Sequence, residues 1–135
     1  MMLEEQLTKN RILNKTGAFS IRKGTRDAVA SLRYANELLA GDGKNLVLMY
    51  PQGAIRSMHQ HSLSFEKGVE RITQGLEGRI QIVLVNILTD YFSAPKPELH
   101  FRMELYPFEA PLDIKDLESA YNRFFNRSIE DQTAL

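Results

Sequence analysis

Residues Leu46–Ser57, with the sequence LVLMYPQGAIRS, decide the expected fold. The four large apolar residues that open this stretch are too few for a helix and are typical of a short strand buried on both faces. Proline lacks the N–H that a strand ladder needs, so the strand is expected to end at Pro51, and Gly53 permits a sharp turn close to a ligand. Ligands collect at the carboxyl ends of parallel strands, so this turn, with Arg56 just beyond it, predicts a site for a cluster of anionic oxygens.

The composition of the chain restricts its class. Lys and Arg number 17, as do Asp and Glu, and this balance argues against a general nucleic-acid binder. The chain has no cysteine, which excludes thiol catalysis, iron–sulfur clusters and thiolate zinc sites. The first residues do not have the pattern of a signal peptide, and the longest apolar run, Ile80–Leu88, is far too short for a membrane span. We expect a single domain over residues 1–135.

Strand and helix patterns alternate on either side of the central stretch. Residues Gly17–Ile21 alternate as a strand does, and Thr25 is expected to cap a helix whose apolar stripe ends at Gly41. Helical spacing returns from Phe65 to Leu76, and the β-branched run Ile80–Leu88 is typical of a second parallel strand that is covered on both faces.

The last third of the sequence adds an edge strand and a helix. Apolar and polar residues alternate from Leu99 to Leu105, which is the pattern of a half-buried strand at the edge of a sheet. Asp113 is expected to cap a final helix with an aromatic face, followed by a frayed tail after Ile129. The sequence therefore predicts an α/β fold with a largely parallel sheet and helices on both faces.

Two motifs carry a resemblance to a known family. GAFSIRK at Gly17–Lys23 and YPQGAIRS at Tyr50–Ser57 occur in this order with one helix between them. They are similar to the patterns Gly-x-x-Phe-x-x-Arg and Phe-Pro-Glu-Gly-Thr-Arg-Ser of the glycerolipid acyltransferases, which transfer an acyl chain to lysophosphatidic acid and related acceptors. Residues Phe65–Gly68, FEKG, and the strand Ile82–Val85 also match. The resemblance extends over residues 1–105.

The resemblance implies a site, substrates and a location. In the complete enzyme the acceptor phosphate would be bound by basic residues and the hydroxyl positioned by the glycine turn; the substrate-binding candidates are Arg22, Lys23, Pro51, Gln52, Gly53 and Arg56. The partners would be a lysophospholipid and an acyl thioester, acyl-CoA or acyl carrier protein, with no bound cofactor, metal or nucleic acid. The resemblance also implies phospholipid biosynthesis in the cytoplasm, by an enzyme peripheral to the membrane surface.

The chain departs from the family at the catalytic base. Family members carry His-x-x-x-x-Asp, in which the histidine is the general base and the aspartate orients it. Here the histidines are His59, His61 and His100, and none of them is followed at the fifth position by aspartate. The resemblance therefore implies that the chain begins after its catalytic base and is inactive alone. If leading strands are missing, one edge of the sheet stays unpaired, and such an edge predicts self-association.

Three further departures affect the binding residues. Gln52 stands where the family has glutamate, and one extra residue shifts Arg56 by one place. Lys23 occupies the position of the expected phosphate-binding arginine, which keeps the charge but loses the bidentate fork.

Other interpretations remain open from the sequence. The chain could be a non-catalytic α/β module that keeps an anionic-lipid or phosphate pocket, and its basic residues could be solvated loop charges. A nucleotide binder is a weaker alternative because the chain lacks both Gly-x-Gly-x-x-Gly and Gly-x-x-x-x-Gly-Lys. His59 and His61 form His-x-His, which could hold a metal ion or substitute for the base, but no third ligand is evident.

Overall fold

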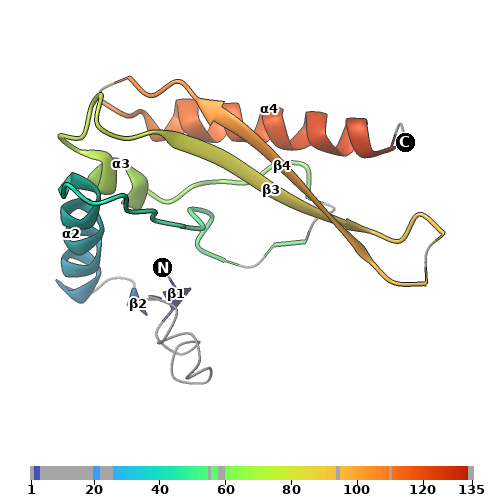
Figure 1. Ribbon diagram of the computed structural model, residues 1–135, viewed down its shortest axis with the longest axis horizontal. Helices are drawn as coiled ribbons and strands as arrows, with labels where there is room; N and C mark the ends of the chain where they lie inside the picture. Colours follow the sequence, from blue (N-terminus) through green and yellow to red (C-terminus); the bar gives the residue numbers. More distant parts are fainter. Residues whose placement is uncertain are drawn as a thin grey trace.

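The computed structural model describes residues 2–3, 20–21, 26–54, 56–57, 60–93, 95–109 and 111–133. In chain order its elements are β1 (Met2–Leu3), β2 (Ser20–Ile21), α2 (Arg26–Ala40), α3 (Gly68–Thr73), β3 (Ile82–Asp90), β4 (Glu98–Tyr106) and α4 (Ile114–Thr133). Strands β3 and β4 form a long hairpin with α4 alongside it, while α2 and α3 lie together at one end (Figure 1).

The predicted fold class is wrong, because the described residues contain an antiparallel hairpin and no largely parallel sheet. Strand β3 pairs antiparallel with β4, in a register that runs from Ile82 opposite Tyr106 to Asp90 opposite Glu98. Parallel pairing is confined, within the described residues, to the two-residue strands β1 and β2. The hairpin forms between neighbours in sequence, whereas a parallel sheet needs distant segments and therefore costs more loop-closure entropy.

The stretch that was expected to be the central strand is not a strand. Residues 44–50 carry no helix or strand assignment, and the side chains of Leu46 and Leu48 are 92% and 57% exposed. The expected neighbour, β3, pairs with β4 along one edge, and no described segment pairs with its other edge. Without a ladder to join, residues 44–50 form no strand.

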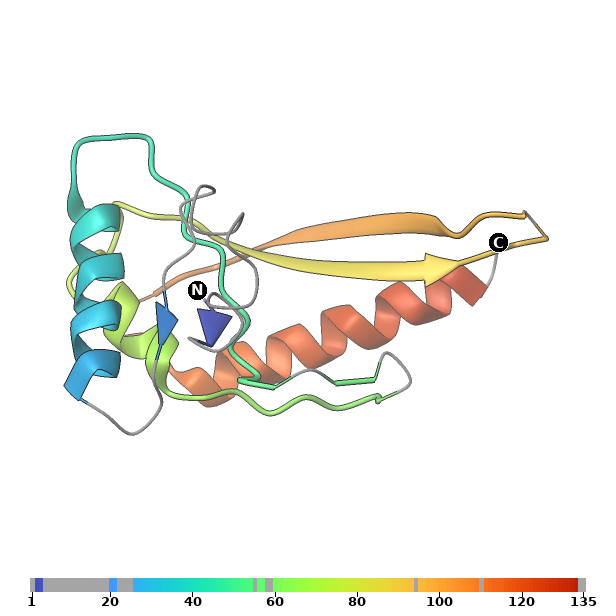
Figure 2. The ribbon, with the colours of Figure 1, turned by 90° about the horizontal axis from the view of Figure 1, so that it is seen from below.

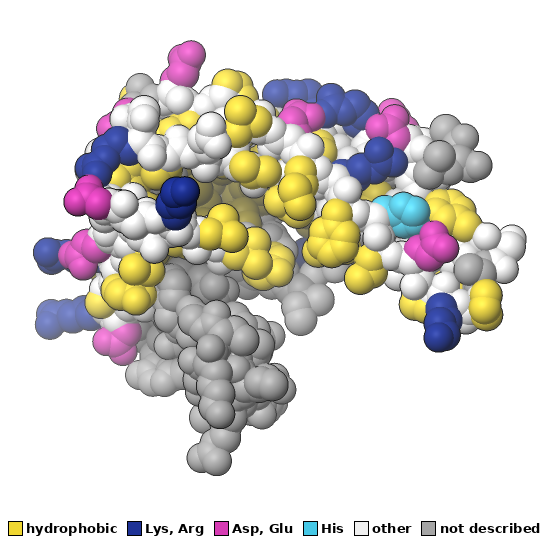
Figure 3. Space-filling view, viewed as in Figure 1, with side chains coloured by type: hydrophobic (Ala, Val, Ile, Leu, Met, Phe, Trp, Pro, Cys, Tyr) yellow, Lys and Arg dark blue, Asp and Glu magenta, His cyan; other side chains and the backbone are white. Residues whose placement is uncertain are grey.

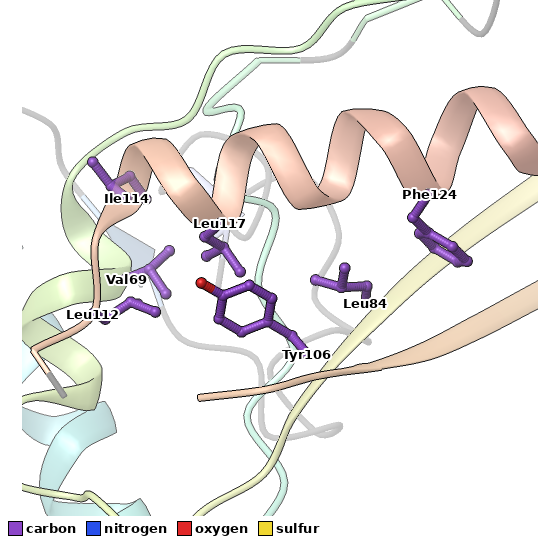
Figure 4. Packing of buried hydrophobic residues seen from close by; sticks show 7 residues of the cluster. All are labelled: Val69, Leu84, Tyr106, Leu112, Ile114, Leu117 and Phe124. Atoms are coloured by element: carbon purple, nitrogen blue, oxygen red, sulfur yellow. The ribbon is translucent and has the colours of Figure 1, made fainter. Parts of the chain in front are cut away.

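The core lies between α4, the hairpin and α3 (Figure 4). Apolar residues recur along one face of α4, as the sequence predicts, and Leu117 and Phe124 are 3% and 4% exposed. Together with Ile114 at the start of α4, they pack in one cluster with residues of the hairpin, α3 and the 107–113 connection, which include Leu84, Tyr106, Val69 and Leu112. This packing fixes α4 against one face of the hairpin.

The start of α4 agrees with the sequence prediction, and its end does not. Asp113 caps the helix as predicted, since its carboxylate accepts the N–H of Lys115 (2.8 Å), and Glu70 of α3 accepts the N–H of Ile114 (3.3 Å). The expected fraying after Ile129 is not observed, because the helix continues to Thr133 and buries Gln132.

Helix α2 has nearly the predicted bounds and is joined to α3 through an asparagine. The Asn36 amide donates to the backbone carbonyls of Ile72 (2.8 Å) and Gln74 (2.9 Å) at the end of α3. Gly68 allows the close approach, since a Cβ there would lie 3.3 Å from a methyl carbon of Leu32. Helix α3 is shorter than the predicted Phe65–Leu76, since it begins at Gly68 and ends at Thr73, where Gln74 leaves the helical backbone conformation.

The hairpin buries the opposite face from the one that its sequence indicates. The alternation in β4 predicts that Leu99, Phe101, Met103 and Leu105 face the core, yet each is at least 56% exposed. Helix α4 covers the other face, where Tyr106 and the buried β3 residues Leu84 and Leu88 lie (Figure 2). Alternation identifies two faces of a strand but not which of them a helix covers.

Candidate functional site

The predicted glycine turn is present, although no strand precedes it. The N–H of Gly53 donates to the carbonyl of Tyr50 (3.2 Å), and Pro51 and Gln52 occupy the two central positions of the turn. Gly53 has φ +63°, in the left-handed region that side chains with a Cβ rarely adopt. Pro51, Gln52 and Gly53 are all half-buried, so the turn is partly enclosed by other segments.

One of these segments is the FEKG stretch, Phe65–Gly68, which also matches the family. The N–H of Glu66 donates to the carbonyl of Pro51 (2.8 Å), which brings Phe65–Gly68 beside the turn. Two stretches that are separated in sequence by a loop therefore meet in space. The cation next to Glu66, Lys67, is exposed, as is Arg56, which follows the turn.

Helix α4 holds the segment that leads to this junction. The N–H of Phe65 donates to the carboxylate of Glu118 (2.6 Å), and Asn122 makes a paired contact with the backbone of Leu63, donating to its carbonyl and accepting from its N–H (both 2.9 Å). One turn further along α4, Asn126 donates to the carbonyl of His61 (3.2 Å). The extended segment therefore runs beside α4 (Figure 2).

The backbone donor changes the acidity of its partner. The N–H of Phe65, with a smaller contribution from Lys115, stabilises the charged form of Glu118 and lowers the pKa of that carboxyl. Residues Glu118, Asn122 and Asn126 recur every four positions and form a polar stripe on α4. This spacing is the signal in the sequence that would have found them.

The six predicted binding residues fall into three groups. Pro51, Gln52 and Gly53 share the turn, and Arg56 follows it with an exposed side chain. Arg22 and Lys23 lie outside the described residues, so the expected grouping of the six around one lysophospholipid acceptor stays a prediction.

The histidines do not form a site with the turn in the described part of the chain. His59 lies outside the described residues, and the backbone of exposed His61 is held by Asn126. His100 lies in β4 opposite Leu88, with its ring 5.3 Å from that of Phe92. Among the described residues, no group of three or more His, Asp and Glu side chains is arranged to hold a metal ion.

Two cavities lie away from the turn. The first, of about 310 Å³, lies beside α3, with Glu70, Arg71 and Leu112 among its lining residues. The second, of about 220 Å³, lies between the hairpin and α4 and is lined in part by Tyr106, Asp116 and Arg123. In the second cavity the Tyr106 hydroxyl donates to the Asp116 carboxylate (2.5 Å). Of the predicted binding residues that the structure describes, Pro51, Gln52, Gly53 and Arg56, none lines either cavity.

The stability of the fold should fall in alkali as Tyr106 ionises. Burial of this phenol, reinforced by its bond to Asp116, raises the pKa of Tyr106 to about 12. The neutral form is favoured in the folded state, so its contribution is complete below the unfolded pKa near 10 and is lost as the pH rises through about 12. We expect urea unfolding to show a loss of about 1–2 kcal/mol across this interval.

The Tyr106→Phe variant provides the control. It removes the titrating hydroxyl and should lose this alkaline step, while Tyr121, whose pKa burial also raises, remains in place. An identical step in both proteins would assign the pH dependence to other groups.

In the part of the chain that the structure describes, no helix combines the length and the apolar character that crossing a membrane requires. Comparison of the sequence with models of protein families and with curated proteins, and of the structure with solved structures, finds no match.

Proposed function

We propose that the chain is a portion of an acyltransferase that moves an acyl group from acyl-CoA or acyl carrier protein to a lysophospholipid such as 1-acylglycerol-3-phosphate. Its own part in this reaction is to bind the phosphate of the acceptor. The observation that supports the proposal is the 2.8 Å hydrogen bond from Glu66 to the carbonyl of Pro51. It joins the YPQG turn to the FEKG stretch, and both stretches resemble the same family.

The chemistry around this junction suits a phosphate. Arg56 follows the YPQG turn and Lys67 lies within the FEKG stretch, and both side chains are exposed. Guanidinium and ammonium groups are the side chains that bind phosphate oxygens by charge-assisted hydrogen bonds. The positive φ of Gly53 favours glycine at this position, and because glycine has no side chain, the turn leaves room for the glycerol backbone of the acceptor.

The residues at the junction do not supply the proton acceptor. Acyl transfer requires a base to take the proton from the acceptor hydroxyl as its oxygen attacks the thioester carbonyl and the thiol leaves. The sequence lacks His-x-x-x-x-Asp, and His100 lies in the hairpin rather than at the turn. We therefore assign binding to these residues and expect no acyl transfer from the 135-residue chain alone.

An NMR titration with glycerol 3-phosphate, the soluble headgroup of the acceptor, tests the assignment. We expect the amide signals of Gly53, Arg56 and Lys67 to shift. Arg56→Ala and Lys67→Ala should each weaken binding by about tenfold, since each removes a charge-assisted contact. Lys96→Ala, which removes an exposed cation near the tip of the hairpin, should leave the affinity unchanged.

The outcomes separate the alternatives. Equal affinity for inorganic phosphate and glycerol 3-phosphate would favour a general phosphate-binding module over an acyl-acceptor site, and a preference for AMP would favour a nucleotide binder. Absence of binding, or shifts confined to residues far from the turn, would contradict the proposal. Acyl transfer by a purified sample of the chain would refute the division between binding and catalysis.

A further inference from the structure

The hairpin has one face that none of the described helices covers. Four cross-strand pairs form this outer face: Val83 with Leu105, Val85 with Met103, Ile87 with Phe101, and Thr89 with Leu99. None of these side chains is charged, and threonine is the one polar member.

The outer face is unusually exposed for its composition. Met103 is 67% exposed, Leu99 59% and Leu105 58%. Phe101, Val83 and Ile87 are about half exposed, and Val85 is partly buried. Hydrophobic side chains accordingly gather across the middle of the molecule in the view of Figure 3. The face presents on the order of 600 Å² of apolar surface, which is at the upper end of what monomeric proteins expose.

We propose that the outer face is the interface of a homodimer, in which the hairpins of two copies stack face to face. A two-fold interface uses the same patch on both chains, and an uncharged apolar patch is complementary to itself. Stacking would bury about 1,200 Å² in total, which reaches the lower limit for specific interfaces. Two packed sheets lie about 10 Å apart, so the side chains of the two outer faces interdigitate.

The absence of charge on this face selects a second copy over a membrane surface. Elements that lie on membranes combine apolar residues with Lys and Arg, which attract anionic lipids. The eight side chains of the outer face include neither residue. In β4 the charged residues Arg102 and Glu104 belong to the other face, where Glu104 pairs with Arg127 of α4.

Sedimentation velocity over a concentration series tests the dimer, and the test is independent of the proposed function. We expect a species of twice the 15.5 kDa of one chain, in reversible equilibrium with the monomer. Phe101→Lys places a charge in the middle of both faces and should raise the dissociation constant at least about 100-fold. Val29→Lys, at a half-exposed apolar position of α2, should leave it unchanged.

Circular dichroism and thermal unfolding must show that both variants keep the fold. A second measurement uses the absence of cysteine from the chain. Oxidation of Met103→Cys should yield a disulfide-linked dimer, and Val29→Cys should not.

A monomer at every concentration would overturn the proposal. So would a dimer that withstands Phe101→Lys, or a monomer that binds neutral lipid vesicles through this face.

Discussion

Replacement of Phe124 by alanine is expected to lower the free energy of unfolding by about 3–5 kcal/mol, as truncation of a buried aromatic ring does. The Phe124 side chain is 4% exposed and packs in the cluster that joins α4 to the hairpin. Removal of the ring loses its burial and leaves a cavity between α4 and the hairpin. Urea unfolding followed by circular dichroism measures the loss.

Phe92→Ala is the matched control. Phe92 lies at the hairpin turn and is 42% exposed, so the same chemical change should cost about 1 kcal/mol or less. Equal losses in the two variants would mean that α4 does not pack against the hairpin as the structure shows.

Replacement of Asn86 by leucine is expected to raise the free energy of unfolding by about 1–3 kcal/mol. Asn86 is 4% exposed and lies between Leu84 and Leu88 on the face of β3 that α4 covers. Neither polar atom of its amide has a hydrogen-bond partner among the described residues. Leucine has a similar volume and removes the cost of burying an amide without partners. Urea unfolding at neutral pH measures the gain.

The opposite result is expected for Asn122→Leu. The Asn122 amide makes two bonds to the backbone of Leu63, so its replacement leaves both backbone groups without these bonds and should cost about 1–2 kcal/mol. Destabilisation by Asn86→Leu as well would show that the Asn86 amide is hydrogen-bonded in solution.

The helices and strands of the last third could be predicted because their patterns are long. Helix α4 carries an apolar stripe over its length, and the alternation in β4 indicates a strand whichever of its two faces is buried. The direction of strand pairing could not be predicted, since a β-branched run such as β3 suits a parallel or an antiparallel neighbour. The prediction of which face of the hairpin is covered was also wrong, because α4 packs on the face of Leu84 and Tyr106.

The candidate site was predicted only in its local part. Pro51 and Gly53 indicate a turn through their own backbone preferences, and the turn is present. The contact between Pro51 and Glu66 is not encoded locally, because it depends on where α4 holds the intervening segment. The contacts of Glu118 and Asn122 were not predicted, because polar residues on a helix are usually solvated.

The hydrogen bonds between α4 and residues 61–65 have a consequence for local unfolding. The amide protons of Leu63, Phe65 and Glu66 are all engaged, although these residues belong to no helix or strand. Leu63 and Phe65 donate to side chains of α4 and Glu66 donates to the carbonyl of Pro51, so the first two lose their protection from exchange with solvent when that helix undocks. The loop and the helix therefore open as one cooperative unit, and the turn at Gly53 loses its support in the same event.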